Sequence, residues 1–432
     1  MVHVAEDADT PADAAPTEGS ADRSEPAGEP AAPPEFPLLR LAEPVPPLTE
    51  TGPGLQRVAA ALAAGSGPVA IDAERASGHR YSQRAYLVQL RRAGSTTALV
   101  DPIAAPDMAP LVEALDGTEW VLHAASQDLP CLIELGLRPA RLFDTELAGR
   151  LLNMPRVGLA TLVAELYGHR LAKEHSAVDW STRPLPEPWL EYAALDVEVL
   201  VELRHLLADR LVAAGKAGWA AEEFEALTHF TGPEPRPDPW RRTSGLHRVR
   251  GRRALGVVRE LWEARDRLAA ELDIAPGRVL SDVAIVEAAV ALPRGRQALR
   301  ALPGMRHRQA RRHLDLWSAA VERALSAPDS QLPPTTGRTD GLPPPRSWPD
   351  RNPAAAARLR ACRTVVAELC EQHDLPAENL LTPEWVRRLA WAPPEPIDTD
   401  TVGGFLRQRG AREWQVGLTA ARFAEVMFDR AS

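Results

Sequence analysis

Two carboxylates in an apolar run are the first residues that could do chemistry. Asp72 and Glu74 lie in the segment PVAIDAERA, residues 68–76. Side chains two residues apart leave the same face of a β-strand, so these acids would stand side by side. A protein tolerates such a pair where a cation lies between them, and hard dications such as Mg²⁺ prefer oxygen ligands. An exposed acidic edge is the alternative interpretation, because the Asp-x-Glu pattern on its own is common.

Other side chains that could bind or act beside a metal ion occur at two further places in the chain. Tyr192 and Asp196 are four residues apart in a predicted helix, which puts them on one face. A phenol beside a carboxylate can orient a water held by a metal, although a buried Tyr bonded to an Asp would also explain the pair. Asp128 lies in the first turn of another predicted helix, for which Ser126 is the expected N-cap. An acid there favours the helix dipole, or it could be a metal ligand at a strand-to-helix junction.

The segments that carry these residues predict an α/β domain. Four candidate strands are short, β-branched and bounded by Gly, Ser or Pro: residues 68–76, 84–92, 96–102 and 119–125. Three strands in succession favour antiparallel hairpins. Helical periodicity follows in TELAGRLLN, in GLATLVAELYG and in one long predicted helix over residues 186–215. We therefore expect a mixed sheet flanked by helices.

Composition divides the chain further. Residues 1–50 are rich in Ala, Pro and acids, so we expect a disordered tail that buries too little apolar surface to fold. The remaining segments are the α/β domain (51–230), a linker (231–244), a first all-helical domain (245–325), a Pro-rich linker (326–349) and a second all-helical domain (350–432).

The two helical domains are interpreted as copies of one fold. DIAPGRVLSD at 273–282 aligns without a gap with DLPAENLLTP at 374–383, and each segment follows an amphipathic helix. Independent helical bundles with similar caps are the alternative. The copies differ in charge, because residues 241–325 carry eighteen arginines against nine acids within a chain of net charge −9. A basic module in an acidic chain favours contact with an anionic polymer.

Composition also excludes some classes of protein. No stretch reaches about 18 uncharged apolar residues, so a membrane span and a membrane partner are not expected. The first residues lack the basic start and apolar run of a secretion signal. Three cysteines give no disulfide framework and no zinc-site spacing. We expect a cytoplasmic protein, and no obligate protein partner is evident.

The acids and the tyrosine appear in an order that resembles the DEDD exonucleases. An acid pair on the first strand is followed by an Asp after a later strand and by the pattern Tyr-x-x-x-Asp on a helix. In one branch of these enzymes a His stands five residues before the last Asp. That position is Glu191 here, whereas Tyr192 stands four residues before Asp196, so the tyrosine branch fits better.

Longer segments narrow the resemblance to the ribonuclease D family. VAIDAERASGHRYSQRAYLVQL, HAASQDLPCL and KEHSAVDWSTRPLPEPWLEYAALDVEVL are similar to that family's motifs, and they lie within residues 55–225. The resemblance implies a ribonuclease H-like exonuclease domain followed by two small all-α HRDC-like domains. HRDC denotes the helicase-and-ribonuclease-D C-terminal domain, and LWEARDRLAAELDIAPGRVLSD and LRALPGM look like its first copy.

The resemblance also implies an activity. It predicts 3′→5′ hydrolysis of RNA by two Mg²⁺ or Mn²⁺ ions with release of nucleoside monophosphates, and transfer RNA precursors are the family's typical substrate. The metal ligands would be Asp72, Glu74, Asp128 and Asp196, Tyr192 would orient the attacking water, and Asp144 would be structural support. A DNA-directed 3′→5′ exonuclease that acts on single-stranded DNA and a nucleic-acid-binding scaffold without catalysis are the alternatives.

Arginines are the expected contacts to nucleic acid, because clustered arginines suit phosphate binding. An ordinary solvated face is the alternative for the clustered ones. Arg75, where the family more often has an apolar or small residue, is expected to touch the terminal nucleotide. The candidates in the first helical domain are Arg248, Arg250, Arg252, Arg253, Arg306, Arg308, Arg311 and Arg312.

Overall fold

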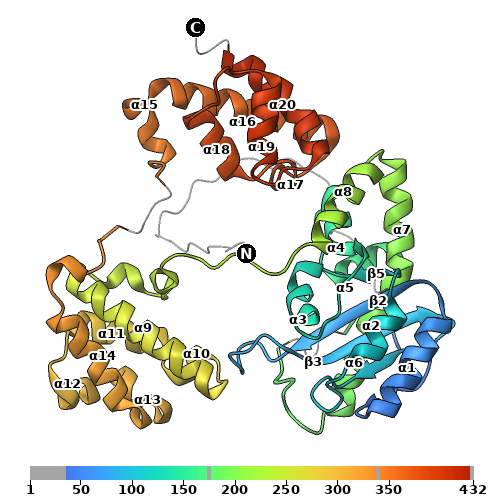
Figure 1. Cartoon of the computed structure of the whole chain (residues 1–432), viewed down its shortest axis with the longest axis horizontal. Helices are drawn as coiled ribbons and strands as arrows, with labels where there is room; N and C mark the ends of the chain where they lie inside the picture. The colour runs from blue at the N-terminus through green and yellow to red at the C-terminus, as the bar shows by residue number, and fades with distance from the viewer. Residues whose placement is uncertain (1–35, 173–176, 337–340, 429–432) are drawn as a thin grey trace, which may run out of the picture. The chain divides into compact units, whose positions relative to one another are not determined.

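The computed structural model describes residues 36–172, 177–336 and 341–428 (Figure 1). Most of the expected tail, residues 1–35, lies outside the described residues. For residues 36–50 the expectation of disorder was wrong. β1 (Leu48–Thr49) joins the edge of the sheet, and Leu38 bridges to Arg170. Leucines in this stretch pack against the core, which offsets the entropy of ordering the chain.

One mixed sheet forms the α/β domain and confirms the expected fold class. Its other strands are β2 (Ser66–Arg75), β3 (Ala85–Ala93), β4 (Ala98–Val100), β5 (Glu119–Leu122) and β6 (Arg141–Asp144). The order is β1-β4-β3-β2-β5-β6. β2, β3 and β4 pair antiparallel, as expected of the three successive strands, whereas β5 and β6 run parallel to β2. β2 therefore lies inside the sheet, with a neighbour on each side.

Helices cover both faces of this sheet (Figure 1). They are α1 (Gly52–Ala64), α2 (Ala109–Leu115), α3 (Leu129–Glu134), α4 (Thr145–Leu151), α5 (Leu159–Leu162), α6 (Glu187–Glu198), α7 (Leu200–Ala213) and α8 (Ala217–Thr228). Val69, Ile71 and Ala73 of β2 pack in one core cluster with leucines of α1, α2 and α3. Ala70 packs on the opposite face with Val197 and Leu200. This alternation turns the even-numbered residues of β2 toward α6 and α7.

The long helix predicted over residues 186–215 is two helices, so that prediction was wrong in its continuity. α6 ends at Glu198 and α7 begins at Leu200. The break at Val199 lets α6 pack on β2, β3 and β4 while α7 packs on β2, β5 and α4. One straight helix could not follow both surfaces of the twisted sheet.

Two all-helical domains follow. The first holds α9 (Arg252–Leu272), α10 (Pro276–Val279), α11 (Asp282–Ala291), α12 (Gly295–Ala301), α13 (Arg308–Arg312) and α14 (Leu314–Ser326). The second holds α15 (Trp348–Arg351), α16 (Pro353–His373), α17 (Ala377–Leu380), α18 (Pro383–Trp391), α19 (Thr399–Arg407) and α20 (Glu413–Phe428). α9 and α16 each have 21 residues, and each ends at an Asp with positive φ, Asp273 or Asp374. The aligned segments thus have the same local structure. Among the described helices, none combines the length and apolar character that a bilayer span requires.

An ion pair to a buried carboxylate fixes the loop that leads into α6. Arg183 Nε lies 2.7 Å from one carboxylate oxygen of Asp101, and Arg183 Nη2 lies 2.9 Å from the other. Arg183 also donates to the carbonyl oxygens of Trp180 and Tyr86. Asp101 is buried at the end of β4. This bidentate contact therefore ties the sheet to the segment from which α6 begins.

We expect Arg183→Ala to destabilise the domain by about 3 kcal/mol, because it leaves the buried Asp101 carboxylate without its cation. The loss is at the lower end of the range for such pairs, since backbone N–H groups of Ile103 and Ala104 still donate to Asp101. Urea unfolding measures the effect. Arg150→Ala is the matched control, because its i,i+4 pair with Glu146 is partly exposed and such pairs contribute only about 0.3–0.5 kcal/mol. Equal losses in both variants would contradict the prediction.

Candidate active site

β2 presents two carboxylates to α6. Asp72 and Glu74 alternate with Ile71 and Ala73, which are buried in the core on the other face. The acids therefore share the face that α6 covers, as the two-residue spacing predicted. Both residues pair with β3, so the backbone holds both side chains in fixed positions.

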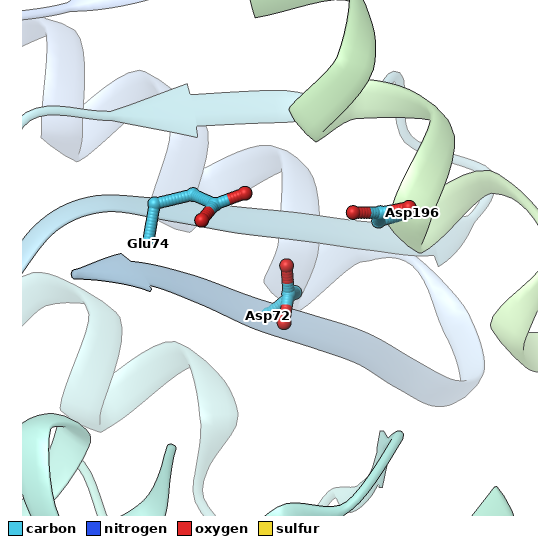
Figure 2. A group of neighbouring side chains, drawn as sticks. All are labelled: Asp72, Glu74 and Asp196. Atoms are coloured by element: carbon cyan, nitrogen blue, oxygen red, sulfur yellow. The ribbon is translucent and has the colours of Figure 1, made fainter. Parts of the chain in front are cut away.

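α6 brings the third carboxylate to the same place. Carboxylate oxygens of Asp72, Glu74 and Asp196 all lie within 4.8 Å of one another. Figure 2 shows the three carboxyl groups directed at one common space. Tyr192 lies one turn before Asp196 and hydrogen-bonds to its carboxylate. The helix is positioned by an ion pair 2.8 Å long between Arg91 of β3 and Glu198 in its last turn.

Asp128 lines the same cavity, which has a volume of about 720 Å³ and also takes in Tyr192. Asp128 is not part of the three-carboxylate group, and its nearest described counterion is Arg75 at 3.7 Å. The structure thus assembles three of the four expected acids tightly and places the fourth on the wall of the same cavity.

The turn that carries Asp128 is capped from a distant strand. Ser126 does not cap the helix as expected; it lies inside a short 3-10 turn that follows Ala124, whose φ is +57°. The carboxylate of Asp144, at the end of β6, accepts hydrogen bonds from the backbone N–H groups of Ala124 and Ala125. It also accepts from the N–H groups at the start of α4. Asp144 therefore supports the site by fixing the turn before Asp128.

Burial dominates the electrostatics of the acids. It raises the pKa of Asp72 and raises the pKa values of Glu74, Asp128 and Asp196 well above their ordinary range. Repulsion from the neighbouring carboxylates adds to the effect at Glu74, Asp128 and Asp196. Anionic oxygens gathered in this way are the donor set that Mg²⁺ and Mn²⁺ prefer, so the residues fit the dications that the fold family implies.

Tyr192 stays a phenol in this environment. Burial first, and then the charges of Asp196, Glu74 and Asp72, raise its pKa far above the ordinary value. The hydroxyl therefore keeps its proton and can donate a hydrogen bond at the edge of the acid cluster.

His123, which also lines the cavity, contacts another side chain of the protein. Its Nδ1 lies 2.9 Å from Thr145 Oγ1, and burial lowers its pKa to about 4. It therefore stays neutral near pH 7.

One polar neighbour of the acids was not singled out from the sequence. Gln89 of β3 lies directly opposite Asp72 and is fully buried. A Gln in the apolar run AYLVQL reads as an ordinary strand residue, and only the pairing register reveals its position.

The arginines that were expected to contact nucleic acid lie in different surroundings. Arg75 lies in the cavity beside Asp128. Arg252 and Arg253 donate to backbone carbonyl oxygens of the segment 324–333. The remaining candidates of the first helical domain are exposed: Arg248, Arg250, Arg306, Arg308, Arg311 and Arg312.

Three family models match this chain. A model described as 3′-5′ exonuclease matches residues 50–212. One described as HRDC domain matches residues 254–321, and one described as 3′ to 5′ exonuclease C-terminal domain matches residues 341–427. The matched ranges coincide with the α/β domain and the two helical domains.

Whole-chain comparisons agree with these models. Ribonuclease D of Gluconacetobacter diazotrophicus is 35% identical over 335 residues, which cover 75% of this chain and 81% of that protein. A crystal structure of a protein from Bifidobacterium adolescentis is 38% identical with a TM-score of 0.82, covering 91% of this chain and all of the other. The crystal structure of Escherichia coli RNase D, described as an exoribonuclease involved in structured RNA processing, is 26% identical with a TM-score of 0.65 and covers 89% and 98% of the two chains. The resemblance drawn from the motifs is confirmed, and the chain belongs to the ribonuclease D family of 3′–5′ exonucleases.

Proposed function

We propose that this chain hydrolyses RNA from the 3′ end and releases nucleoside monophosphates, with structured RNAs such as transfer RNA precursors as substrates. The observation that carries the proposal is the group of three carboxylates, Asp72, Glu74 and Asp196, with oxygens within 4.8 Å of one another. The preference for RNA is supported by the similarity to the Escherichia coli enzyme, whose structure is described as that of an exoribonuclease. The three free cysteines are consistent with action in a reducing cytoplasm.

We assign two divalent ions, Mg²⁺ or Mn²⁺, to Asp72, Glu74, Asp128 and Asp196. When bound, such a pair would activate the attacking water and stabilise the leaving 3′ oxygen. Tyr192 would hold the water through its hydroxyl, and Arg75 would exchange its contact with Asp128 for the terminal phosphate or nucleotide. The exposed arginines of the first helical domain would contact the phosphate backbone, and such contacts provide affinity without sequence preference.

Asp72→Asn and Asp196→Asn test the assignment. Each removes one anionic ligand with little change in size. We expect hydrolysis to fall by about 10³-fold or more, beyond the effect of deleting a single hydrogen-bond donor to a transition state. RNA binding, measured by fluorescence anisotropy in the absence of divalent ions, should persist. Undiminished release of nucleotides by either variant would rule the site out.

Matched RNA and DNA strands test the choice of sugar. The carboxylates act at the phosphate and do not distinguish the two polymers, so discrimination requires contacts with the 2′-hydroxyl. We expect 3′-extended RNA to be degraded faster than DNA of the same sequence, with a 3′-blocked RNA as the control. Faster digestion of the DNA would favour a DNA-directed exonuclease.

The raised pKa values predict a dependence of stability on pH. A carboxyl group whose pKa is raised by folding stabilises the fold fully below its unfolded pKa of about 4, and that contribution is lost as the pH rises through the folded-state value. Without divalent ions the chain should therefore melt at a lower temperature at pH 8 than at pH 5.5. Mg²⁺ should raise the melting temperature more at pH 8, because metal binding requires ionised carboxylates. Thermal unfolding with Mg²⁺ and with chelator measures both effects, and equal stabilisation by Mg²⁺ at the two pH values would contradict the prediction.

A further inference from the structure

Gln89 lies directly across β2–β3 from Asp72. The pairing register sets Ala70 opposite Arg91, Asp72 opposite Gln89 and Glu74 opposite Leu87. Directly opposed residues of an antiparallel pair point to the same face, with Cβ atoms about 4.5–5.5 Å apart. The amide of Gln89 is therefore on the face of the sheet that carries the acids and is covered by α6.

The neighbours of Gln89 on this face confirm that placement. Leu87, two residues before it, packs with Ala193 and Ala194 of α6. Arg91, two residues after it, pairs with Glu198 of α6. On the other side Gln89 is opposite Leu99 of β4, which belongs to the same apolar cluster as Leu87. The surroundings of the amide are thus largely apolar, except toward Asp72.

The amide of Gln89 has no hydrogen-bond partner within the part of the chain that the structure describes. The residue is 0% exposed, and both Oε1 and Nε2 are unpaired. Arg91 does not hydrogen-bond to this amide, because the Arg91 guanidinium donates to Thr97 and Glu198. The large majority of buried side-chain polar atoms in folded proteins find a partner, so a fully buried amide with none needs a reason.

Stability alone does not supply that reason. An unpaired buried polar group costs about 1–3 kcal/mol, whereas an apolar side chain of the same shape would fill the space without this penalty. Departures of this kind are expected at functional sites, where the sequence serves chemistry rather than packing.

We propose that Gln89 is a positioning residue for Asp72: its Nε2 donates to the Asp72 carboxylate when that group is ionised and binds a dication. The inference rests on the proposed function, because it deepens the metal site assigned there. Carboxylate ligands are commonly oriented by a hydrogen bond to the oxygen that faces away from the metal, and loss of such a partner weakens metal affinity or activity about 10–100-fold. The opposed position of the two residues puts the amide within reach through rotation of the flexible Gln side chain.

The role differs from that of Arg75, a charged neighbour of the acids. Arg75 is a cation that lies 3.7 Å from Asp128, and its positive charge also favours the ionised forms of Asp72 and Glu74. A neutral amide can fix the orientation of a carboxylate without neutralising it. Gln89 is thus suited to hold Asp72 from within the sheet and leave its charge available.

Gln89→Leu tests the proposal in the full chain. The substitution keeps the approximate volume and removes the amide. We expect the melting temperature in chelator to stay equal or rise, because an unpaired buried group is gone. We expect the dissociation constant for Mg²⁺, measured by titration calorimetry without RNA, to rise about 10–100-fold. Nucleotide release should require correspondingly more Mg²⁺, while KM for RNA at saturating Mg²⁺ stays unchanged.

Trp120→Phe is the matched control. Trp120 also carries a buried Nε1 without a described partner, but it packs in the cluster on the opposite face of the sheet. Its substitution removes an unpaired polar atom away from the acids, so Mg²⁺ affinity should not change.

Gln89→Met provides a second variant that also removes the amide and keeps a similar shape.

The outcomes separate the two proposals. Unchanged Mg²⁺ affinity in Gln89→Leu, alongside lost affinity in Asp72→Asn, would overturn the role of Gln89 and leave the metal site intact. Unchanged affinity in Asp72→Asn as well would overturn the proposed function itself. If neither Gln89→Leu nor Gln89→Met folds, the inference is also wrong, because it requires the amide to be dispensable for stability.

Discussion

Mutual repulsion among closely spaced carboxylates is the constraint on which this structure depends. Three acids with oxygens less than 5 Å apart, and a fourth on the same cavity wall, would separate if their backbones were free to move. They do not, because Asp72 and Glu74 lie on an interior strand and Asp196 on a helix clamped to that sheet. The rigidity of β2 and α6 holds these groups together, and a bound dication would offset the repulsion among their ionised forms.

The clamps that enforce this arrangement are themselves electrostatic. Arg183 holds the loop before α6 against the buried Asp101, and Arg91 holds the last turn of α6 through Glu198. Both arginines reach from one element to another far away in the sequence. The site is therefore surrounded by ion pairs whose two members contact each other. Neither Arg183 nor Arg91 neutralises the acids of the site, because each is paired with Asp101 or Glu198.

The sequence predicted the parts of the site that depend on local pattern. The spacing of Asp72 and Glu74 requires only strand alternation, and that of Tyr192 and Asp196 requires only helical periodicity. Residues that depend on long-range packing were missed or misjudged. Gln89 becomes notable only through its register with β2. Ser126 lies inside a 3-10 turn and does not cap α3, and the start of that turn is held by Asp144 from another strand. β1, with two residues, is too short for periodicity to identify, and β6 was not predicted. The break at Val199 follows from the surfaces that α6 and α7 cover.

The hydrogen bonds between Asp144 and the turn before Asp128 also indicate which part of the site can separate from the rest. Among the described strands β6 is at the edge of the sheet and pairs with β5, whereas β2, which carries Asp72 and Glu74, lies inside the sheet. Partial opening of a sheet edge requires less free energy than global unfolding. Transient separation of β6 from β5 would release Asp144, and with it the backbone that carries Asp128, while the other three acids stay in place. Assembly of the four proposed ligands would therefore depend on how firmly this one edge strand is held, a quantity that backbone amide hydrogen exchange reports separately from the stability of the whole domain.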